Sequence, residues 1–448
     1  MMHRSSWDPV LPPEMASGAM RIARDVANRL RDQEHVGLAI SAAPRQTAFP
    51  RAVRWLEPTL AQGDAGLALT CAYLDACLPD EGWDRTGHDY LATAAAGAEH
   101  LPHLSGGMFG GLAGLAFAAW SLSRGMTRYR RLLATIDASL LPRLILQADS
   151  LSQVPTEGVS VGDFDVISGL AGIGSYLLLR REDPDAIAAL VSALRASLAL
   201  ASETGGRPRW WTPSHLLGDE ETAGLYPHGN LNCGLAHGIP GPLALMALAL
   251  SQGIDAPGIE GALERLVDWL LKHRADDRWG VNWPYAVPLT EEGLPDHGAP
   301  TWGPSRAAWC YGAPGVARAL WLAGVARHCA EWRDLAIEAM EAVYRRPIAV
   351  RCIESPTFCH GVAGLLQITL RFANDTRLPL FTEAAVSLTE ELLSAYEPDS
   401  LLGYRNREPG GTRVDQPGLL DGAPGVLLVL LAASTAVEPS WDRAFLLS

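Results

Sequence analysis

The sequence predicts an all-α protein whose helices form two layers, an α/α toroid of seven inner and seven outer helices. Three observations support this fold class. A Gly-x-x-Gly element recurs seven times, an apolar run follows each copy, and amphipathic charged stretches lie between the runs. Hydrophobic residues make up 48% of the 448 residues and charged residues 19%, which indicates a well-packed globular chain and excludes a disordered one.

The glycine pairs mark the expected starts of the inner helices. Their first glycines lie 48 to 74 residues apart, a spacing that fits one helical pair per repeat with loops of variable length. The runs after the pairs are apolar on nearly all sides, as at 115–122 and 426–433, which predicts helices buried all round. All seven N-terminal ends should then meet at one end of the barrel, where we expect the chemistry. The pairs are Gly63/Gly66, Gly111/Gly114, Gly169/Gly172, Gly238/Gly241, Gly312/Gly315, Gly361/Gly364 and Gly422/Gly425.

Amphipathic stretches with one charged face predict the outer helices. Residues 1–19 are expected to form a flexible N-terminal segment, and 275–305 an insertion loop that is irregular or carries a short strand. No linker divides the sequence, so we expect a single toroid domain over 1–448. The predicted outer helices cover 20–33, 89–101, 129–149, 185–203, 259–274, 331–346 and 380–397.

Charge and cysteine usage narrow the class of protein. A net charge of −14 argues against a free-standing nucleic-acid binder. The seven cysteines are too sparse for a disulfide framework and fit a reducing compartment. The N-terminus lacks the apolar run of a signal peptide, and no apolar run approaches the roughly 20 residues of a membrane span. We therefore expect a cytoplasmic protein.

Two neighbouring repeats carry metal-ligand residue types in the same place. Cys310 stands two residues before one glycine pair, and Cys359 and His360 stand directly before the next. Because the loops of adjacent repeats should be neighbours, the three side chains are expected to converge. Two cysteines and one histidine suit Zn²⁺, one ion per chain. Three protein ligands with one open position is the pattern of a catalytic zinc site.

Four further residues fall near the expected metal site. His237 occupies the place in its repeat that His360 occupies, and Asp165 belongs to the preceding repeat. An Asp–His pair holds an imidazole in one tautomer for acid–base chemistry. Arg306 is a cation close to Cys310, and Tyr311 carries a hydroxyl that could donate a proton. Each of these four also has an alternative interpretation as an ordinary capping or interhelical contact.

Together these segments resemble the lanthionine synthetase C-like family, the cyclases of lanthipeptide biosynthesis. The resemblance extends from about residue 63 to the C-terminus, and its zinc motifs are its most specific part. The family has an α/α toroid fold. The segments are 232–238 (NCGLAHG), 309–312 (WCYG), 359–361 (CHG), 165–172 (DVISGLAG) and 421–425 (DGAPG).

The resemblance assigns roles by position. It implies that Cys310, Cys359 and His360 are zinc ligands. It places the active-site residues around the metal at His237, Asp165, Arg306 and Tyr311. The tyrosine at position 311 resembles the bacterial cyclases. A chain of this length leaves no room for a fused dehydratase, which implies a stand-alone class I cyclase.

The implied reaction adds a cysteine thiol of a precursor peptide to dehydroalanine or dehydrobutyrine, which closes a thioether ring. Zinc would deprotonate the thiol, and His237 is the best candidate acid for the enolate. Arg306 could stabilise the charge of the enolate or orient His237, and Tyr311 is an alternative proton donor. The sequence does not give the order of these roles. The family also implies a dehydrated precursor peptide, a separate dehydratase and an exporter as partners, with peripheral association at the inner face of the membrane.

Three other functions compete with a cyclase. A protein prenyltransferase β subunit also activates a thiol on zinc, but no basic cluster lies near these motifs. A relative that adds glutathione to dehydrated residues is disfavoured by Tyr311. A non-catalytic scaffold that binds a leader peptide has no need of an open zinc site.

Overall fold

The computed structural model describes residues 7–448 except 154–156, 255, 297 and 299–304. The chain divides into two compact units. Unit 1 comprises Met1–Ser105, Phe109–Ala134 and Ile353–Asp442, and unit 2 comprises Gly106–Met108, Thr135–Cys352 and Arg443–Ser448. Each unit is described by itself below, and a single domain over 1–448 stays a prediction. Among the described residues, no helix combines the length and apolar character that crossing a membrane requires.

The glycine pairs begin the helices that they were expected to begin. In the described part of the chain, seven helices start within two residues of a predicted first glycine, and their residues are almost entirely buried. They are α3 (Asp64–Cys77), α5 (Leu112–Ser121), α8 (Leu170–Leu179), α11 (Pro240–Ser251), α13 (Ala313–Ala326), α15 (Val362–Thr376) and α17 (Ala423–Ser434).

The amphipathic stretches are helical as well. Residues 13–19, expected to belong to a flexible segment, instead form the first turns of a helix, because Pro13 at its first position and Glu14 favour a helix start there. Residues 1–6 lie outside the described residues. The outer helices are α1 (Pro13–Arg31), α4 (Trp83–Glu99), α6 (Arg130–Ser152), α9 (Pro184–Leu200), α12 (Ile259–Lys272), α14 (Ala330–Arg345) and α16 (Pro379–Ser394).

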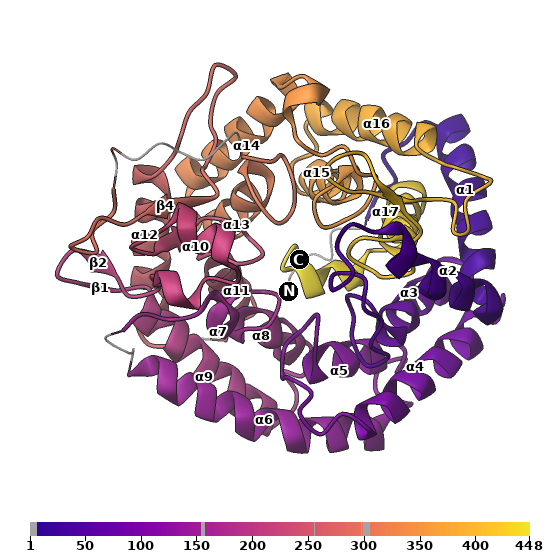
Figure 1. The fold of residues 1–448 in the computed structure, drawn as a ribbon, viewed down its shortest axis with the longest axis horizontal. Coiled ribbons are helices and arrows are strands. Elements are labelled where there is room, and N and C mark those ends of the chain that lie inside the picture. Colours follow the sequence, from indigo (N-terminus) through magenta and orange to yellow (C-terminus); the bar gives the residue numbers. More distant parts are fainter. Residues whose placement is uncertain (1–6, 154–156, 255, 297, 299–304) are drawn as a thin grey trace. The chain divides into compact units, whose positions relative to one another are not determined.

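Within each unit the helices pack in two layers (Figure 1). In unit 1 the buried helices contact one another in the order α15, α17, α3, α5, and α16, α1 and α4 cover the first three of them from outside. In unit 2 the order is α8, α11, α13, with α9, α12 and α14 as the outer partners. The predicted alternation of inner and outer helices is therefore present in both units.

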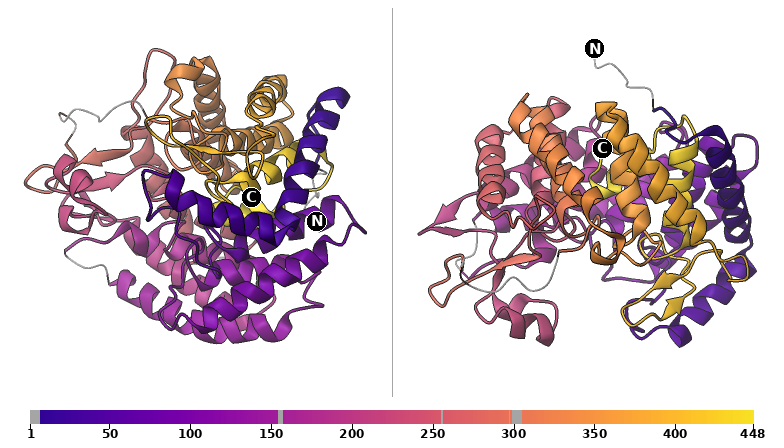
Figure 2. Two further views of the ribbon diagram at one scale, coloured as in Figure 1. Left: turned by 45° about the vertical axis from the view of Figure 1, so that its right-hand side comes forward. Right: turned by 90° about the horizontal axis from the view of Figure 1, so that it is seen from above.

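The remaining elements are short. The described strands are two or three residues long and pair only in twos, so helices predominate in every view (Figure 2). For the insertion, expected to be irregular or to carry a short strand, the structure has a short strand, β4, which pairs with β3. Residues 297 and 299–304 of that insertion lie outside the described residues. These elements are α2 (Gln33–Gln46), α7 (Val161–Phe164), α10 (Glu220–Leu225), β1 (Glu203–Thr204), β2 (Arg207–Pro208), β3 (Asn230–Asn232), β4 (Ala286–Pro288), β5 (Asn406–Arg407), β6 (Arg413–Val414) and the 3-10 turns Ser214–Leu216, Ile348–Val350 and Ser440–Phe445.

Glycine is required at the helix starts because the preceding loop folds back on them. A Cβ at Gly312 would collide with the carbonyl oxygen of Arg306, six residues earlier, and the φ of Gly312 is +92°. A Cβ at Gly172 would collide in the same way with the carbonyl oxygen of Val166, again six residues earlier. The recurring pair therefore encodes one loop shape in successive repeats.

The loops of neighbouring repeats are joined by main-chain hydrogen bonds. In unit 1 the N–H of Cys359 donates to the carbonyl oxygen of Leu420 at 2.9 Å. In unit 2 the N–H of Ala236 donates to the carbonyl oxygen of Cys310 at 3.2 Å, and the N–H of Val166 donates to that of Ala236 at 3.0 Å. These bonds fix which side chains of adjacent loops meet.

Candidate metal centre and acid–base pair

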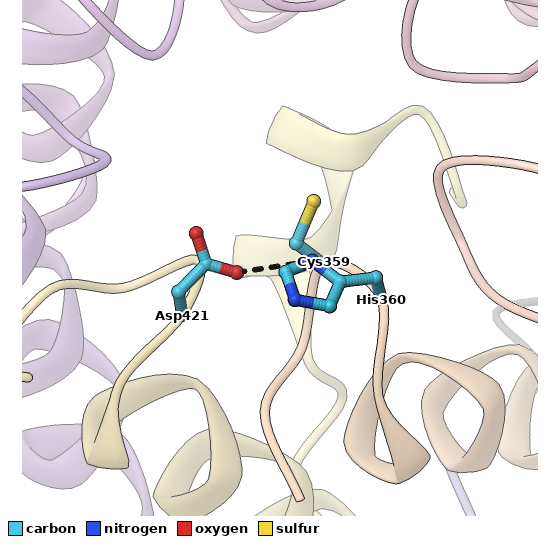
Figure 3. Close-up of side chains that lie close together, drawn as sticks. All are labelled: Cys359, His360 and Asp421. Atoms are coloured by element: carbon cyan, nitrogen blue, oxygen red, sulfur yellow. Dashed lines mark ion pairs between the residues drawn. The ribbon is translucent and has the colours of Figure 1, made fainter. Parts of the chain in front are cut away.

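A group of metal-ligand side chains lies in unit 1, at the start of α15 and α17. The ligand atoms of Cys359, His360 and Asp421 all lie within 4.8 Å of one another. Figure 3 shows Cys359 and His360 on the loop before α15 and Asp421 on the loop before α17. The Nδ1 atom of His360 is 3.4 Å from Oδ1 of Asp421. A thiol, an imidazole and a carboxylate form a donor set that fits zinc.

Cys310 lies in unit 2, at the start of α13, and is buried. Its carbonyl oxygen holds the neighbouring loop through the N–H of Ala236. The ligand set of Cys310, Cys359 and His360 draws on both units and stays a prediction.

An Asp–His pair lies in unit 2 between the starts of α8 and α11. His237 Nδ1 is 2.7 Å from Oδ2 of Asp165. The Oδ1 atom of the same carboxylate accepts the N–H groups of Ser168 at 2.7 Å and Gly169 at 2.9 Å. Asp165 is about 1% exposed, whereas 37% of the His237 side chain is exposed. The pair thus has a fixed buried carboxylate and an accessible imidazole.

Tyr311 stands beside this pair. Its ring centroid is 6.2 Å from that of His237 and 5.1 Å from that of Tyr285. The Nδ2 atom of Asn232 donates to the Tyr311 hydroxyl at 3.1 Å, and Oδ1 of Asn232 accepts the N–H of Gly234 at 3.0 Å. The position of the hydroxyl is therefore set by an amide that is itself held by the main chain.

Arg306 pairs with Tyr285 in unit 2. Burial raises the pKa of Tyr285 above its ordinary value, and the hydrogen-bonded guanidinium of Arg306 opposes that rise. Tyr285 also interacts electrostatically with Cys310. The structure therefore brings together Asp165 with His237, His237 with Tyr311, and Arg306 with Tyr285.

Two cysteines of α3, Cys71 and Cys77, lie within a helix and outside the loops that carry the candidate site. Burial raises the pKa of Cys71 to about 12 and that of Cys77 to about 11. Cys233, which lies near the motifs but outside the shared position, is fully buried, and burial raises its pKa strongly. A thiol whose thiolate is this unfavourable is a poor metal ligand.

Three residues near the site were not predicted, namely Asp421, Asn232 and Tyr285. Asp421 stands directly before a first glycine, as do His237, Tyr311 and His360, so its position in the repeat was a usable signal. Asn232 reaches Tyr311 across 79 residues, and Tyr285 lies in the insertion, directly before β4; neither leaves a periodic signal.

A separate cavity of about 850 Å³ lies in unit 2, beside α12 and the β1–β2 hairpin. Its wall includes Trp210, Trp269 and Lys272. None of the predicted site residues is among the residues that line it.

These features, together with the sequence match, define the class of protein. Residues 54–446 match the family of lanthionine synthetase C-like proteins, and the chain belongs to this family.

A known relative and a solved structure are each similar to this protein over most of the chain. The nisin biosynthesis protein NisC of Lactococcus lactis subsp. lactis is 25% identical over 396 residues, which span 87% of this chain and 89% of the relative. The solved structure of nisin cyclase matches with a TM-score of 0.76 and 22% identity, over 97% of this chain and 98% of that one. This likeness confirms the predicted fold class, the α/α toroid.

Proposed function

We propose that this protein is a lanthipeptide cyclase. It would add cysteine thiols of a precursor peptide to dehydroalanine or dehydrobutyrine residues of the same peptide, forming lanthionine and methyllanthionine rings. The observation that carries the proposal is the meeting of Cys359, His360 and a carboxylate at the helix starts of unit 1. Family membership and the similarity to a nisin biosynthesis protein support it.

The proposed metal is one Zn²⁺ per chain, held by Cys310, Cys359 and His360. When bound, such an ion lowers the pKa of a thiol so that it acts as a nucleophile at neutral pH. The donor set fits because thiolates and imidazole are the ligands that zinc prefers.

The Asp165–His237 pair would move the proton. An ionised carboxylate can only accept, so Asp165 keeps the imidazole hydrogen on Nδ1 and leaves Nε2 for proton transfer. Addition of sulfur to the β-carbon places negative charge on an enolate. In the proposed step, a protonated Nε2 of His237 delivers a proton to the α-carbon and completes the thioether.

Arg306 and Tyr311 would assist at the same place. Arg306 supplies a fixed positive charge for the enolate oxygen, oriented by its hydrogen bond with Tyr285. The Tyr311 hydroxyl, positioned by Asn232, is the second proton donor. The exposure of the His237 ring gives a peptide access to both groups.

The partners follow from the proposed reaction. A precursor peptide supplies both the thiol and the dehydrated residue, so a dehydratase must act first. A separate dehydratase, an exporter and a cytoplasmic location, with association at the inner face of the membrane, belong to this proposal.

The test uses the purified protein and a dehydrated precursor peptide. Because ring closure changes no mass, free thiols are counted by alkylation before and after incubation. The wild-type protein should consume thiols, and His237→Ala should slow their loss by about 10² or more. Addition of glutathione to the same reaction separates the alternatives: a glutathione adduct on the peptide indicates the relative that uses glutathione. Peptide binding with no loss of thiols indicates the scaffold.

A further inference from the structure

We infer that the cavity beside α12 binds a free α-amino acid with a large apolar side chain. The cavity lies within unit 2 and encloses about 850 Å³, a volume typical of pockets for small ligands. Among the described residues that line it, none belongs to the candidate metal centre or to the Asp165–His237 pair. The inference is therefore independent of the proposed function and concerns a second binding site.

Three segments of unit 2 form the walls of the cavity. α12 supplies one wall, the segment 201–210 with β1 and β2 supplies another, and Leu294 and Pro295 of the insertion complete it (Figure 1). A Cβ at Gly206 would lie 3.5 Å from the Leu294 side chain, so the hairpin and the insertion contact each other. An outer helix usually presents its charged face to water. Here two further segments enclose a cavity against that face.

Two indole rings form the apolar part of the wall. The ring centroids of Trp210 and Trp269 are 4.7 Å apart, and the ring planes meet at 82°. Both side chains are buried, and Leu266 and Leu294 line the cavity beside them. Aromatic rings at this angle offer a face and an edge to a third ring or to a large aliphatic group. This part of the cavity therefore favours a ligand with a large apolar side chain.

The charged side chains of the wall are not paired with one another. Asp268 and Lys272 lie four residues apart on α12, a spacing at which acid–base pairs stabilise helices. In the described part of the chain, however, neither side chain forms an ion pair or a hydrogen bond, and the same holds for Glu203 of β1. Arg265 instead donates from Nε to the carbonyl oxygen of Ala201 at 2.7 Å. The wall thus offers a carboxylate and an ammonium one helical turn apart.

The indole N–H of Trp269 is a further donor without an acceptor. Its Nε1 atom is buried, and no hydrogen-bond partner lies within reach among the described residues. Buried donors of folded proteins nearly always have a partner. Because Trp269 lines the cavity, a ligand bound there can supply the acceptor. Lys272 follows three residues later and lies on the same side of α12, so one anionic group can accept from both side chains.

A free α-amino acid matches this set of groups. Its carboxylate accepts from the ammonium of Lys272 and the N–H of Trp269, and its ammonium donates to Asp268. Its side chain then packs against the indole rings of Trp210 and Trp269. An internal peptide segment carries neither charge on its backbone and would leave Asp268 and Lys272 unpaired.

The experiment uses a reporter that the sequence supplies. Lys272 is the single lysine of the 448 residues. Reductive methylation of the full chain with ¹³C-formaldehyde labels this side chain and the N-terminal amine, and it keeps the positive charge of both. The Lys272 signal then reports on the cavity in the NMR spectrum, and the N-terminal signal is the internal control. Calorimetry on unlabelled protein gives the affinities.

The probes separate the two charges of an amino acid. L-phenylalanine, L-tyrosine, L-tryptophan, L-leucine and L-methionine are tested first. Phenylpropionate lacks the ammonium of L-phenylalanine, phenethylamine lacks its carboxylate, and N-acetyl-L-phenylalanine amide has the neutral backbone of a peptide. Equivalent analogues replace these three if another amino acid binds best.

The variants are Lys272→Met, Asp268→Asn and Trp269→Phe. The matched control is Arg195→Gln, which removes an exposed charge from α9 outside the wall of the cavity. Thermal unfolding verifies that each variant is folded. The two charge variants change exposed side chains and therefore keep the test valid even if Trp269→Phe is unstable.

At least one amino acid should shift the Lys272 signal and leave the N-terminal signal in place. Each of its three analogues should bind about tenfold more weakly or worse, because each loses a hydrogen bond to a charged group. Lys272→Met and Asp268→Asn should weaken binding by a similar factor, and Trp269→Phe severalfold. Arg195→Gln should bind as wild type does.

Other results overturn the inference. If no amino acid shifts the Lys272 signal, the cavity is not an amino-acid site. Equally tight binding of N-acetyl-L-phenylalanine amide would identify a site for a peptide segment. Equally tight binding of phenylpropionate or phenethylamine would show that only one charge is recognised. Binding that all three variants leave unchanged would place the amino acid elsewhere on the protein. None of these outcomes bears on thiol consumption, which tests the proposed function separately.

Discussion

Nδ1 of His237 lies 2.7 Å from Oδ2 of Asp165, and the other oxygen of that carboxylate is held by two main-chain N–H groups. The N–H of Val166 also donates to the carbonyl oxygen of Ala236, so the residues next to the pair are joined as well. The imidazole is therefore oriented by a carboxylate whose position is fixed by two main-chain hydrogen bonds. Pre-organisation of this kind is what proton transfer to a carbon requires.

Asp165→Asn should keep the fold and slow cyclisation. The Oδ1 of asparagine can still accept the N–H groups of Ser168 and Gly169, but its Nδ2 would donate to His237 Nδ1 and move the imidazole hydrogen to Nε2. We expect a 10²- to 10⁴-fold loss of rate, measured by alkylation of free thiols over time. Asp163→Asn makes the same charge change two residues away. If Asp165→Asn kept the full rate, the proposed role of His237 as the acid would be wrong.

Zinc binding should depend on Cys359 and not on Cys71, a buried cysteine of α3. Elemental analysis is expected to give about one zinc per chain for wild type and nearly none for Cys359→Ala, because removal of one thiolate greatly weakens a three-residue site. Cys71→Ala is the matched control, since Cys71 is buried in α3 with a pKa of about 12. Metal binding should also release protons. Equal zinc in both variants would place the metal elsewhere.

The glycine pairs made much of the fold predictable, for a steric reason. Each pair belongs to a loop that passes back over the start of its helix, so a side chain there would meet a main-chain oxygen, as at Gly312 and Gly172. The same constraint fixes the residue just before the glycine at the helix start. It covers His237 but not Asp165, which was paired with His237 because it precedes the glycine pair of the adjacent repeat. The structure places the two side chains in contact.

The features that were not predicted depend on contacts between distant segments. β3 and β4 pair across more than 50 residues, and each has only three residues, too few for a recognisable period. Tyr285 reaches Arg306 from the insertion, where no repeat sets its place. α2 contains Pro44 and a weak apolar face, so its helix was not expected. Asp421 was quoted as part of a motif, but its approach to His360 depends on the Leu420 hydrogen bonds.

Replacement of Gly312 by alanine should damage the fold far more than an ordinary glycine substitution. Its φ is +92° and a Cβ would strike the Arg306 carbonyl oxygen, so the loop that carries Cys310 and Tyr311 must move. Gly253→Ala is the control, because its φ is +75° while no atom lies within 4 Å of the added Cβ. We expect about 1–2 kcal/mol of destabilisation for the control and more than about 3 kcal/mol for Gly312→Ala, at the upper end of single substitutions. Urea unfolding measures both. Equal losses would show that only the backbone angle matters.

Asp64 should make stability depend on pH near neutrality. Burial at the start of α3 raises the pKa of Asp64 from 3.8 to about 6, against the hydrogen bond that Trp55 Nε1 donates at 3.0 Å. A carboxyl whose pKa is higher in the folded state binds more protons when folded, so its contribution to stability falls as pH rises from about 4 to about 6. Above that range the ionised, buried group costs about 2–3 kcal/mol, at 1.4 kcal/mol per pKa unit.

Asp64→Asn removes this cost and keeps an acceptor for Trp55. The free energy of unfolding in urea should therefore exceed that of wild type by about 1–3 kcal/mol at pH 7.5, and the difference should shrink toward zero at pH 4. Asp399→Asn, on an exposed loop, should show no such trend. The difference in free energy of unfolding between Asp64→Asn and Asp399→Asn reports the titration of Asp64. The remaining buried carboxylates are present in both variants and contribute equally to both. A gain of stability at pH 4 that disappears at pH 7.5 would reverse the sign and contradict a raised pKa.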